Sequence, residues 1–234
     1  MTIAQMAIDP LKGKYKGRRA QPINTVVTGT DPLIAKTLDM FVHLASKHSL
    51  PVLTANQIDL VNTYLPNFKS KDRNDILNES LANFLNNLIQ KSYDAGNNDF
   101  TLTTNDFVYS YLASDLKGHE KNHLRLAVHG DVGFNFANKA KYLDAYVHGG
   151  SGVAFGSESE HCFFSVEGDQ NIKVLSRAYK SKIVLHKVAD NFESSKAYGC
   201  IFYGVNEQAY QTLRKNIPFW ERVSWRNHVK RYGS

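Results

Sequence analysis

The sequence predicts an α+β fold in which a helical N-terminal region is followed by a right-handed parallel β-helix (a solenoid) and a C-terminal capping helix. Between residues 31 and 99, apolar residues recur at helical spacing. In residues 100–205 the composition shifts to Thr, Val, Phe, Tyr, Gly and His, and a pattern repeats every 19 residues. Residues 206–234 return to helical spacing with many basic side chains. A basic arm at residues 1–30 completes four predicted regions.

The composition supports a folded chain with a substantial core. The 234 residues are 42% hydrophobic and 12% aromatic, which excludes wholesale disorder. Two cysteines exclude a disulfide scaffold. No run approaches the roughly 20 apolar residues of a membrane span, and the first 20 residues lack the apolar core of a signal peptide. We therefore expect a soluble, cytoplasmic protein that does not bind membranes.

The net charge of +6 is concentrated at the two ends of the chain. Residues 1–30 and 206–234 each carry +4, whereas the middle carries −2. Such ends attract phosphates or an acidic partner, or are simply solvated surface. Residues 1–30 show little periodicity, and Thr25 to Thr28 is their one candidate strand. The basic residues of this arm are Lys12, Lys14, Lys16, Arg18 and Arg19.

Three helices are predicted in residues 31–99 from start and stop signals. Ser, Thr or Asp before an apolar periodic run favours a helix start, whereas Pro and Gly end helices. Asp31 caps the first predicted helix and Pro32 is its first residue. Thr54 caps the second helix, which Pro66 ends, and Asp72 begins the third helix, which Gly96 ends. Helices of this size can pack as a small bundle. A bundle with a helix-turn-helix can also read DNA, but few basic side chains lie on the second and third helices, which favours packing.

The nineteen-residue repeat is the strongest signal in the chain. His129-Gly130 recurs as His148-Gly149, and both pairs follow a valine. Alternating apolar columns predict strands with one buried face, and stacked coils bury these columns as ladders about 4.8 Å apart. We expect about five coils, with Phe107 and Tyr109 one step before the columns and Phe202 and Gly204 one step after them. The columns are Leu126, Ala145, Phe164 and Ile183, and Val128, Val147, Val166 and Leu185.

Glycines recur after these strands with the spacing G-x-x-G-x-x-x-G. Such positions require left-handed backbone or close approach between coils. No Lys-Ser/Thr follows them, so a phosphate loop is not expected. The structural glycines are Gly130, Gly133, Gly149, Gly152, Gly156 and Gly168.

With these glycines, the chain resembles the GXGXG β-helix domain found in the C-terminal region of glutamate synthase and in formylmethanofuran dehydrogenase. The resemblance covers about residues 107–205. One coil matches the glycine pattern fully and one nearly, whereas Asn171 and Leu175 replace two glycines in the next. In those families the domain is a structural module that makes contacts with other chains of the enzyme. The resemblance therefore implies a scaffold and supplies no catalytic residues.

The two cysteines are predicted to be free thiols. Cys162 and Cys200 lie 38 residues apart, which is two periods. In register their separation would be about 9.6 Å, beyond the roughly 7 Å limit for a disulfide. His161 precedes Cys162, but neighbours on a strand point to opposite faces, so no Cys-His dyad is expected.

One polar column is a candidate metal site. His129, His148, Glu167 and His186 share one register position, and imidazoles with a carboxylate can hold Zn²⁺ or share a proton. A straight ladder offers its ligands from one side only, however, so a solvated strand end is the favoured interpretation. Glu158, Glu160 and His161 form a second polar cluster with the same interpretation. No H-E-x-x-H, G-x-S-x-G or C-x-x-C motif appears, and no cofactor is expected.

The C-terminal region combines aromatic and basic side chains. Asn206 caps a helix from Glu207 to Lys215, and Pro218 begins a second helical piece. The favoured role is a cap over the last coil; the alternative is binding of nucleic acid by stacking and phosphate contacts. The residues that would bind it, with those of the N-terminal arm, are Arg214, Lys215, Trp220, Arg222, Trp225, Arg226, Lys230 and Arg231.

From these observations we expect a noncatalytic structural or assembly module whose solenoid binds other protein chains in a homo- or hetero-oligomer. A nucleic-acid-binding protein that uses its basic ends is the first alternative. A metal-dependent enzyme at the His/Glu column is the second.

Overall fold

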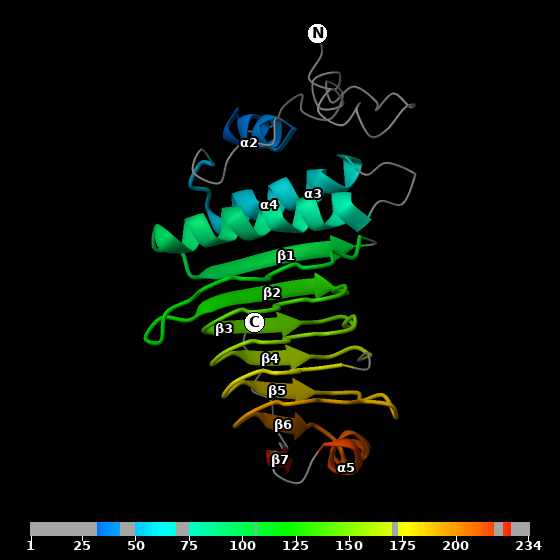
Figure 1. Cartoon of the computed structure of the whole chain (residues 1–234). Helices are drawn as coiled ribbons and strands as arrows, with labels where there is room; N and C mark the ends of the chain where they lie inside the picture. The colour runs from blue at the N-terminus through cyan, green and yellow to red at the C-terminus, as the bar shows by residue number, and fades with distance from the viewer. Residues whose placement is uncertain are drawn as a thin grey trace.

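The computed structural model describes residues 32–42, 50–68, 75–105, 107–169, 173–217 and 222–225. Within these ranges, three α-helices precede a stack of seven parallel strands, which pair in chain order from β1 to β7 (Figure 1). Each strand lies beside the next strand of the chain, so the fold is a β-solenoid with helices at both ends. Its hand remains a prediction that rests on the general preference for right-handed crossovers. The predicted arm at residues 1–30, with Thr25 to Thr28, lies outside the described residues.

The elements have the following bounds. The strands are β1 (Asp99–Asn105), β2 (Leu124–Gly130), β3 (Leu143–Val147), β4 (Phe163–Val166), β5 (Lys182–Leu185), β6 (Ile201–Gly204) and β7 (Arg222–Trp225). The helices are α2 (Pro32–Val42), α3 (Ala55–Tyr64), the 3-10 helix η3 (Leu65–Phe68), α4 (Asp75–Asp94) and α5 (Glu207–Asn216).

The strand register confirms the nineteen-residue repeat from β2 to β6. Leu126 pairs with Ala145, which pairs in turn with Phe164 on the next strand. The ladder continues through Ile183 to Phe202. The second predicted column pairs in the same way through Val128, Val147, Val166, Leu185 and Gly204.

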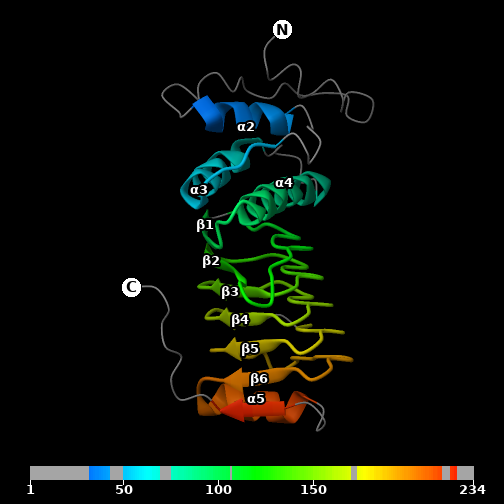
Figure 2. The ribbon, with the colours of Figure 1, turned by 90° about the vertical axis from the view of Figure 1, so that its left-hand side faces the viewer.

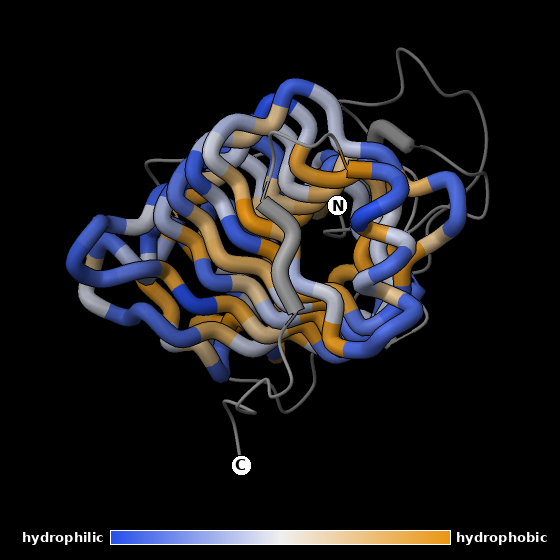
Figure 3. The backbone as a smooth tube through the Cα atoms, turned by 90° about the horizontal axis from the view of Figure 1, so that it is seen from below, coloured by the Kyte–Doolittle hydropathy of each residue, from blue (hydrophilic) through white to orange (hydrophobic). Residues whose placement is uncertain are grey.

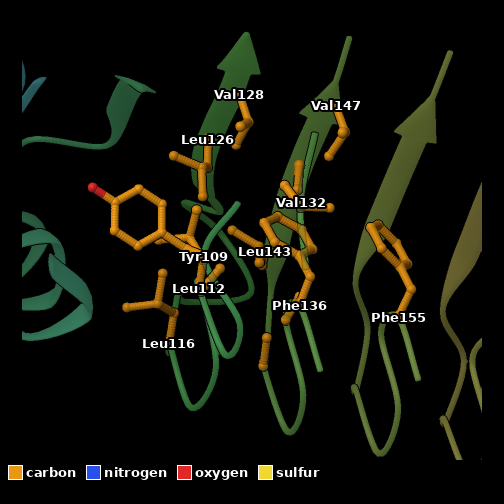
Figure 4. Packing of buried hydrophobic residues seen from close by; sticks show 14 of the residues in the cluster. Tyr109, Leu112, Leu116, Leu126, Val128, Val132, Phe136, Leu143, Val147 and Phe155 are labelled. Carbon is orange, nitrogen blue, oxygen red and sulfur yellow. The ribbon is translucent and has the colours of Figure 1, made fainter. Parts of the chain in front are cut away.

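Both predicted columns point into the solenoid and form its core. Val128 and Val147 face the turn residues Phe136 and Phe155 across the interior (Figure 4). These two phenylalanine rings stack with centroids 5.0 Å apart. Seen along the stack, successive coils superpose as one outline (Figure 3). The outward face differs from the prediction at β4 and β5, where Ser165 and Val184 are buried together with their neighbours on the strand.

The helical region closes the N-terminal end of the solenoid (Figure 2). Helix α3 packs on β1, and α2 and α4 pack on α3. Thr54 caps α3 as predicted, in a capping box with Gln57. The α-helix ends at Tyr64, just before Pro66, as predicted, and the 3-10 helix η3 follows it from Leu65 to Phe68. Asp31 and Asp72 lie outside the described residues, and Gly96, with φ +107°, follows α4 as predicted.

No helix among the described residues is long and apolar enough to cross a membrane. One hydrophobic cluster runs from the helices through the strands to Phe202. The predicted regions 31–99 and 100–205 therefore share a core.

The first coil corrects one prediction. Phe100 and Leu102 of β1, not Phe107 and Tyr109, pair with Leu126 and Val128. The step from β1 to β2 is thus 26 residues, because Phe100 pairs with Leu126. Part of the difference is an extra turn before β2, in which His119 and Asn122 bond to each other. Phe107 and Tyr109 are buried in the segment that follows β1.

The C-terminal region is also corrected. Asn206 caps α5 as predicted, accepting a hydrogen bond from the Ala209 N–H at 2.8 Å. The predicted second helical piece instead contains β7, whose Arg222–Trp225 backbone pairs with β6. Without β7, β6 would be an edge strand whose outer N–H and C=O groups had no backbone partner. The backbone of β7 pairs with these groups. A short apolar alternation such as Val223 and Trp225 fits a strand as well as a helix.

Candidate functional site

The predicted His/Glu column is present at the carboxyl ends of the strands. The rings of His129 and His148 stack with centroids 4.7 Å apart and planes 4° apart. Nδ1 of His148 lies 3.3 Å from a carboxylate oxygen of Glu167. Burial lowers the pKa of His186, and Glu167 partly opposes this shift. His186 is therefore expected to be neutral near pH 7.

The column does not have the geometry of a metal centre. Within the described residues, no three His, Cys, Asp or Glu side chains are grouped so that they could hold a metal ion. The four column residues occupy successive coils, so His129, for example, lies beside His148 rather than opposite it. Tetrahedral zinc requires ligands from several directions. This geometry does not favour the metal-dependent enzyme.

The structural glycines allow the coils to approach closely. A Cβ on Gly149 would lie 2.4 Å from the carbonyl carbon of Gly130, and one on Gly152 would lie 2.4 Å from that of Gly133. The same contact recurs between Gly168 and Gly149, also at 2.4 Å. These glycines have a packing role. In the left-handed region lie Gly130 (φ +125°) and Gly156 (φ +62°).

Cys162 and Cys200 are not joined in a disulfide, as predicted, both are buried, and Cys162 is unsuited to nucleophilic catalysis. Its thiol lies 3.3 Å from each of the carbonyl oxygens of Ala140 and Glu160. Burial raises the pKa of Cys162 to about 12. The neighbouring His161 packs instead on Tyr142, with ring centroids 5.2 Å apart. The expected absence of a Cys-His dyad fits this geometry.

The second polar cluster is divided among ion pairs between coils. Glu158 pairs with Arg177 on the following coil. Glu160 pairs with Lys141 on the preceding coil at 2.7 Å. Opposite charges on neighbouring strands stabilise a sheet modestly, so these acids have a structural role.

Two adjacent register positions just before the strands carry stacked aromatic rings that sequence reasoning missed. Tyr142 stacks on His161, which meets Tyr179 edge-on at 5.6 Å. Tyr179 in turn stacks on Tyr198, with ring centroids 5.7 Å apart and planes 2° apart. Tyr198 is 69% exposed. The signal was available, because each stacked pair lies one period apart in the sequence.

A small apolar surface lies on another side of the first two coils. Phe134 is 44% exposed and Val108 is 41% exposed. Tyr111 meets Phe134 edge-on at 5.7 Å, and the Tyr111 N–H donates to the Phe134 carbonyl at 2.7 Å. We call Tyr111 and Phe134, with the exposed Val108 three residues before Tyr111, the apolar corner.

The residues predicted for nucleic-acid binding at the chain ends are only partly described. Arg214 and Lys215 are exposed in the last turn of α5, and the Arg214 guanidinium lies 5.9 Å from the Tyr210 ring centroid. Arg222 and Trp225 belong to β7. Outside the described residues lie Lys12, Lys14, Lys16, Arg18, Arg19, Trp220, Arg226, Lys230 and Arg231.

Comparison of the chain with protein-family models, curated proteins and solved structures finds no match. The resemblance to the GXGXG domain therefore stays a prediction.

Proposed function

We propose that the chain is a noncatalytic assembly module that binds another protein chain through the apolar corner. The exposure of Phe134 is the observation that carries this proposal. Large apolar side chains that are exposed together in a soluble protein mark interaction surfaces. Phenylalanine and tyrosine are also enriched at the cores of protein interfaces.

The chemistry of the remaining candidates supports a structural role. The thiol of Cys162 is protonated at neutral pH and contacts backbone carbonyls. The glycines are used for coil packing, and Glu158 and Glu160 are used for ion pairs. A solenoid presents a long rigid surface, which suits the display of binding side chains.

The test compares Phe134→Ser with Val52→Ser in the full-length protein. Val52 is 48% exposed and precedes α3, so it offers another apolar-to-serine change at similar exposure in a different part of the chain. Light scattering measures the mass in solution against 26.4 kDa for one chain. Quantitative affinity purification measures heteromeric partners in parallel.

We expect Phe134→Ser to weaken the oligomer, or the binding of one specific partner, about tenfold or more, as hot-spot truncations do. Val52→Ser should leave both unchanged. A wild-type protein that is monomeric, and whose captured proteins do not change in Phe134→Ser, would contradict the proposal.

A further inference from the structure

We infer that the solenoid carries a single-stranded nucleic-acid site at the corner formed by Tyr179, Lys180, Lys182, Lys196 and Tyr198. We call these five residues the basic aromatic corner. The site is separate from the apolar corner and does not depend on the proposed assembly role. It also differs from the basic chain ends, because all five residues belong to described coils of the solenoid.

The first argument is charge. Elsewhere in the solenoid, cations are matched with carboxylates on adjacent coils, as in the pairs of Lys141 with Glu160 and of Lys173 with Glu193. This matching of cations with carboxylates ends at the basic aromatic corner. Lys196 follows Arg177 by one period, so two cations occupy neighbouring coils, an arrangement that costs stability by itself.

The lysines of this corner have no acidic partner among the described residues. Lys180, Lys182 and Lys196 are all exposed, and none of them forms an ion pair there. The neighbouring carboxylates are already occupied, because Glu158 pairs with Arg177 and Glu160 with Lys141. The corner therefore presents uncompensated positive charge to a polyanion.

The second argument is the exposed aromatic surface of Tyr179 and Tyr198, which lies next to Lys180. The rings of Tyr179 and Tyr198 are parallel and are 36% and 69% exposed. The ammonium of Lys180 lies 5.0 Å from the Tyr179 ring centroid. Proteins bind single-stranded nucleic acid without sequence preference by combining a cationic track with rings on which bases stack. An acidic peptide would use the lysines and have little need of the rings.

Binding is measured by fluorescence anisotropy of labelled oligo(dT) of about 15 nucleotides on the full-length protein. Tyr198→Ala should weaken binding about tenfold, because base stacking on an aromatic ring is lost. Tyr198→Phe retains the ring and should bind like the wild type. Because Tyr198 is exposed, both variants should have the same melting temperature as the wild type.

The lysines are tested by salt dependence. Each phosphate contact to a single strand contributes about 0.7 to the slope of log K against log salt. The triple variant Lys180→Gln, Lys182→Gln and Lys196→Gln should therefore lower that slope by about 2. Lys139→Gln is the matched control, because Lys139 occupies the same left-handed corner position as Lys196 three coils earlier. It should leave the slope unchanged.

Unchanged affinity in Tyr198→Ala, or an unchanged salt slope in the triple variant, would overturn the site and assign any binding to the chain ends. Displacement of oligo(dT) by polyglutamate of equal length as effectively as by unlabelled oligo(dT) would also overturn it, since the corner would then recognise acidic protein. None of these results bears on Phe134, so the two proposals fail separately.

Discussion

At the scale of single residues, glycine decides how closely two coils can approach. The backbone of Gly152 lies against that of Gly133, and an added Cβ would meet main-chain atoms that cannot rotate away. The corner positions behave differently. Tyr142, His161 and Lys180 all adopt φ between 48° and 54° at the position that Gly199 occupies in a later coil. Left-handed backbone is thus tolerated here with ordinary side chains, whereas the Gly152 contact excludes any side chain.

We expect Gly152→Ala to destabilise the fold by about 3 kcal/mol, because the methyl group must push two coils apart. Gly199→Ala is the control. It adds a methyl group to left-handed backbone, but the nearest side-chain atom there is 3.5 Å away, so the expected cost is about 1 kcal/mol. The free energy of unfolding in urea measures both. Equal costs would show that the two coils can move apart cheaply, because Gly152 has no left-handed backbone conformation that a methyl group would strain.

At the scale of elements, regular columns were predictable and interruptions were not. The ladder from Leu126 to Phe202 follows from alternation and a fixed period alone. The inserted turn around His119 lengthens the step from β1 to β2, and nothing in the apolar pattern reveals a polar turn of that kind. The sequence predicts a helix at Val223 and Trp225, whereas the structure has a strand, because so short a segment does not distinguish the helical period from the strand period.

The candidate sites were predictable to a different degree. The nineteen-residue period correctly predicts that His129 stacks on His148. It also predicts that Cys162 and Cys200 lie two coils apart and form no disulfide with each other. The apolar corner and the basic aromatic corner were missed because exposure depends on which way each turn faces. A sequence period gives the column of a residue such as Tyr198 but not its exposed fraction.

The helices close the first coil through polar side chains as well as apolar packing. Asn62 donates from Nδ2 to the Thr103 carbonyl at 2.8 Å, and Asp59 accepts from the Thr103 N–H at 3.0 Å. Gln90 donates to the carbonyl and accepts from the N–H of Lys117. These side chains pair backbone groups of the first coil that would otherwise form an open edge.

Asn86 offers the sharpest test of this closure. Its side chain is buried, accepts from the Ala113 N–H at 2.7 Å and donates to the Tyr111 carbonyl at 2.9 Å. We expect Asn86→Ala to cost about 3 kcal/mol in urea unfolding, because it leaves buried backbone groups unpaired. Gln90→Ala removes the same kind of double hydrogen bond, but the bonds of Gln90 to Lys117 are exposed, so water replaces them and the cost should be about 1 kcal/mol or less. Similar costs for both would argue against desolvation as the cause.

At the scale of the whole molecule, the shared core argues that helices and solenoid form one cooperative unit. Leu81 and Leu85 of α4 belong to the same buried cluster as Phe164 and Phe202 of the strands. Repeat proteins couple each unit only to its neighbours, and cooperativity weakens in long arrays. This stack is short, with seven strands, and the polar contacts of the helices add to the coupling at one end.

The chain carries its own reporters for this cooperativity. Its two tryptophans, Trp220 and Trp225, belong to the C-terminal segment, so tryptophan fluorescence reports that end. Circular dichroism at the helical band reports mainly the opposite end, because α4 alone has 20 residues and α5 has 10. We expect the two signals to change at the same urea concentration. Asn86→Ala should move both midpoints together, although Asn86 lies at the helical end. The contrary result is two separate midpoints, of which Asn86→Ala shifts only that of the helical signal. It would mean that the helices unfold as a domain independent of the solenoid.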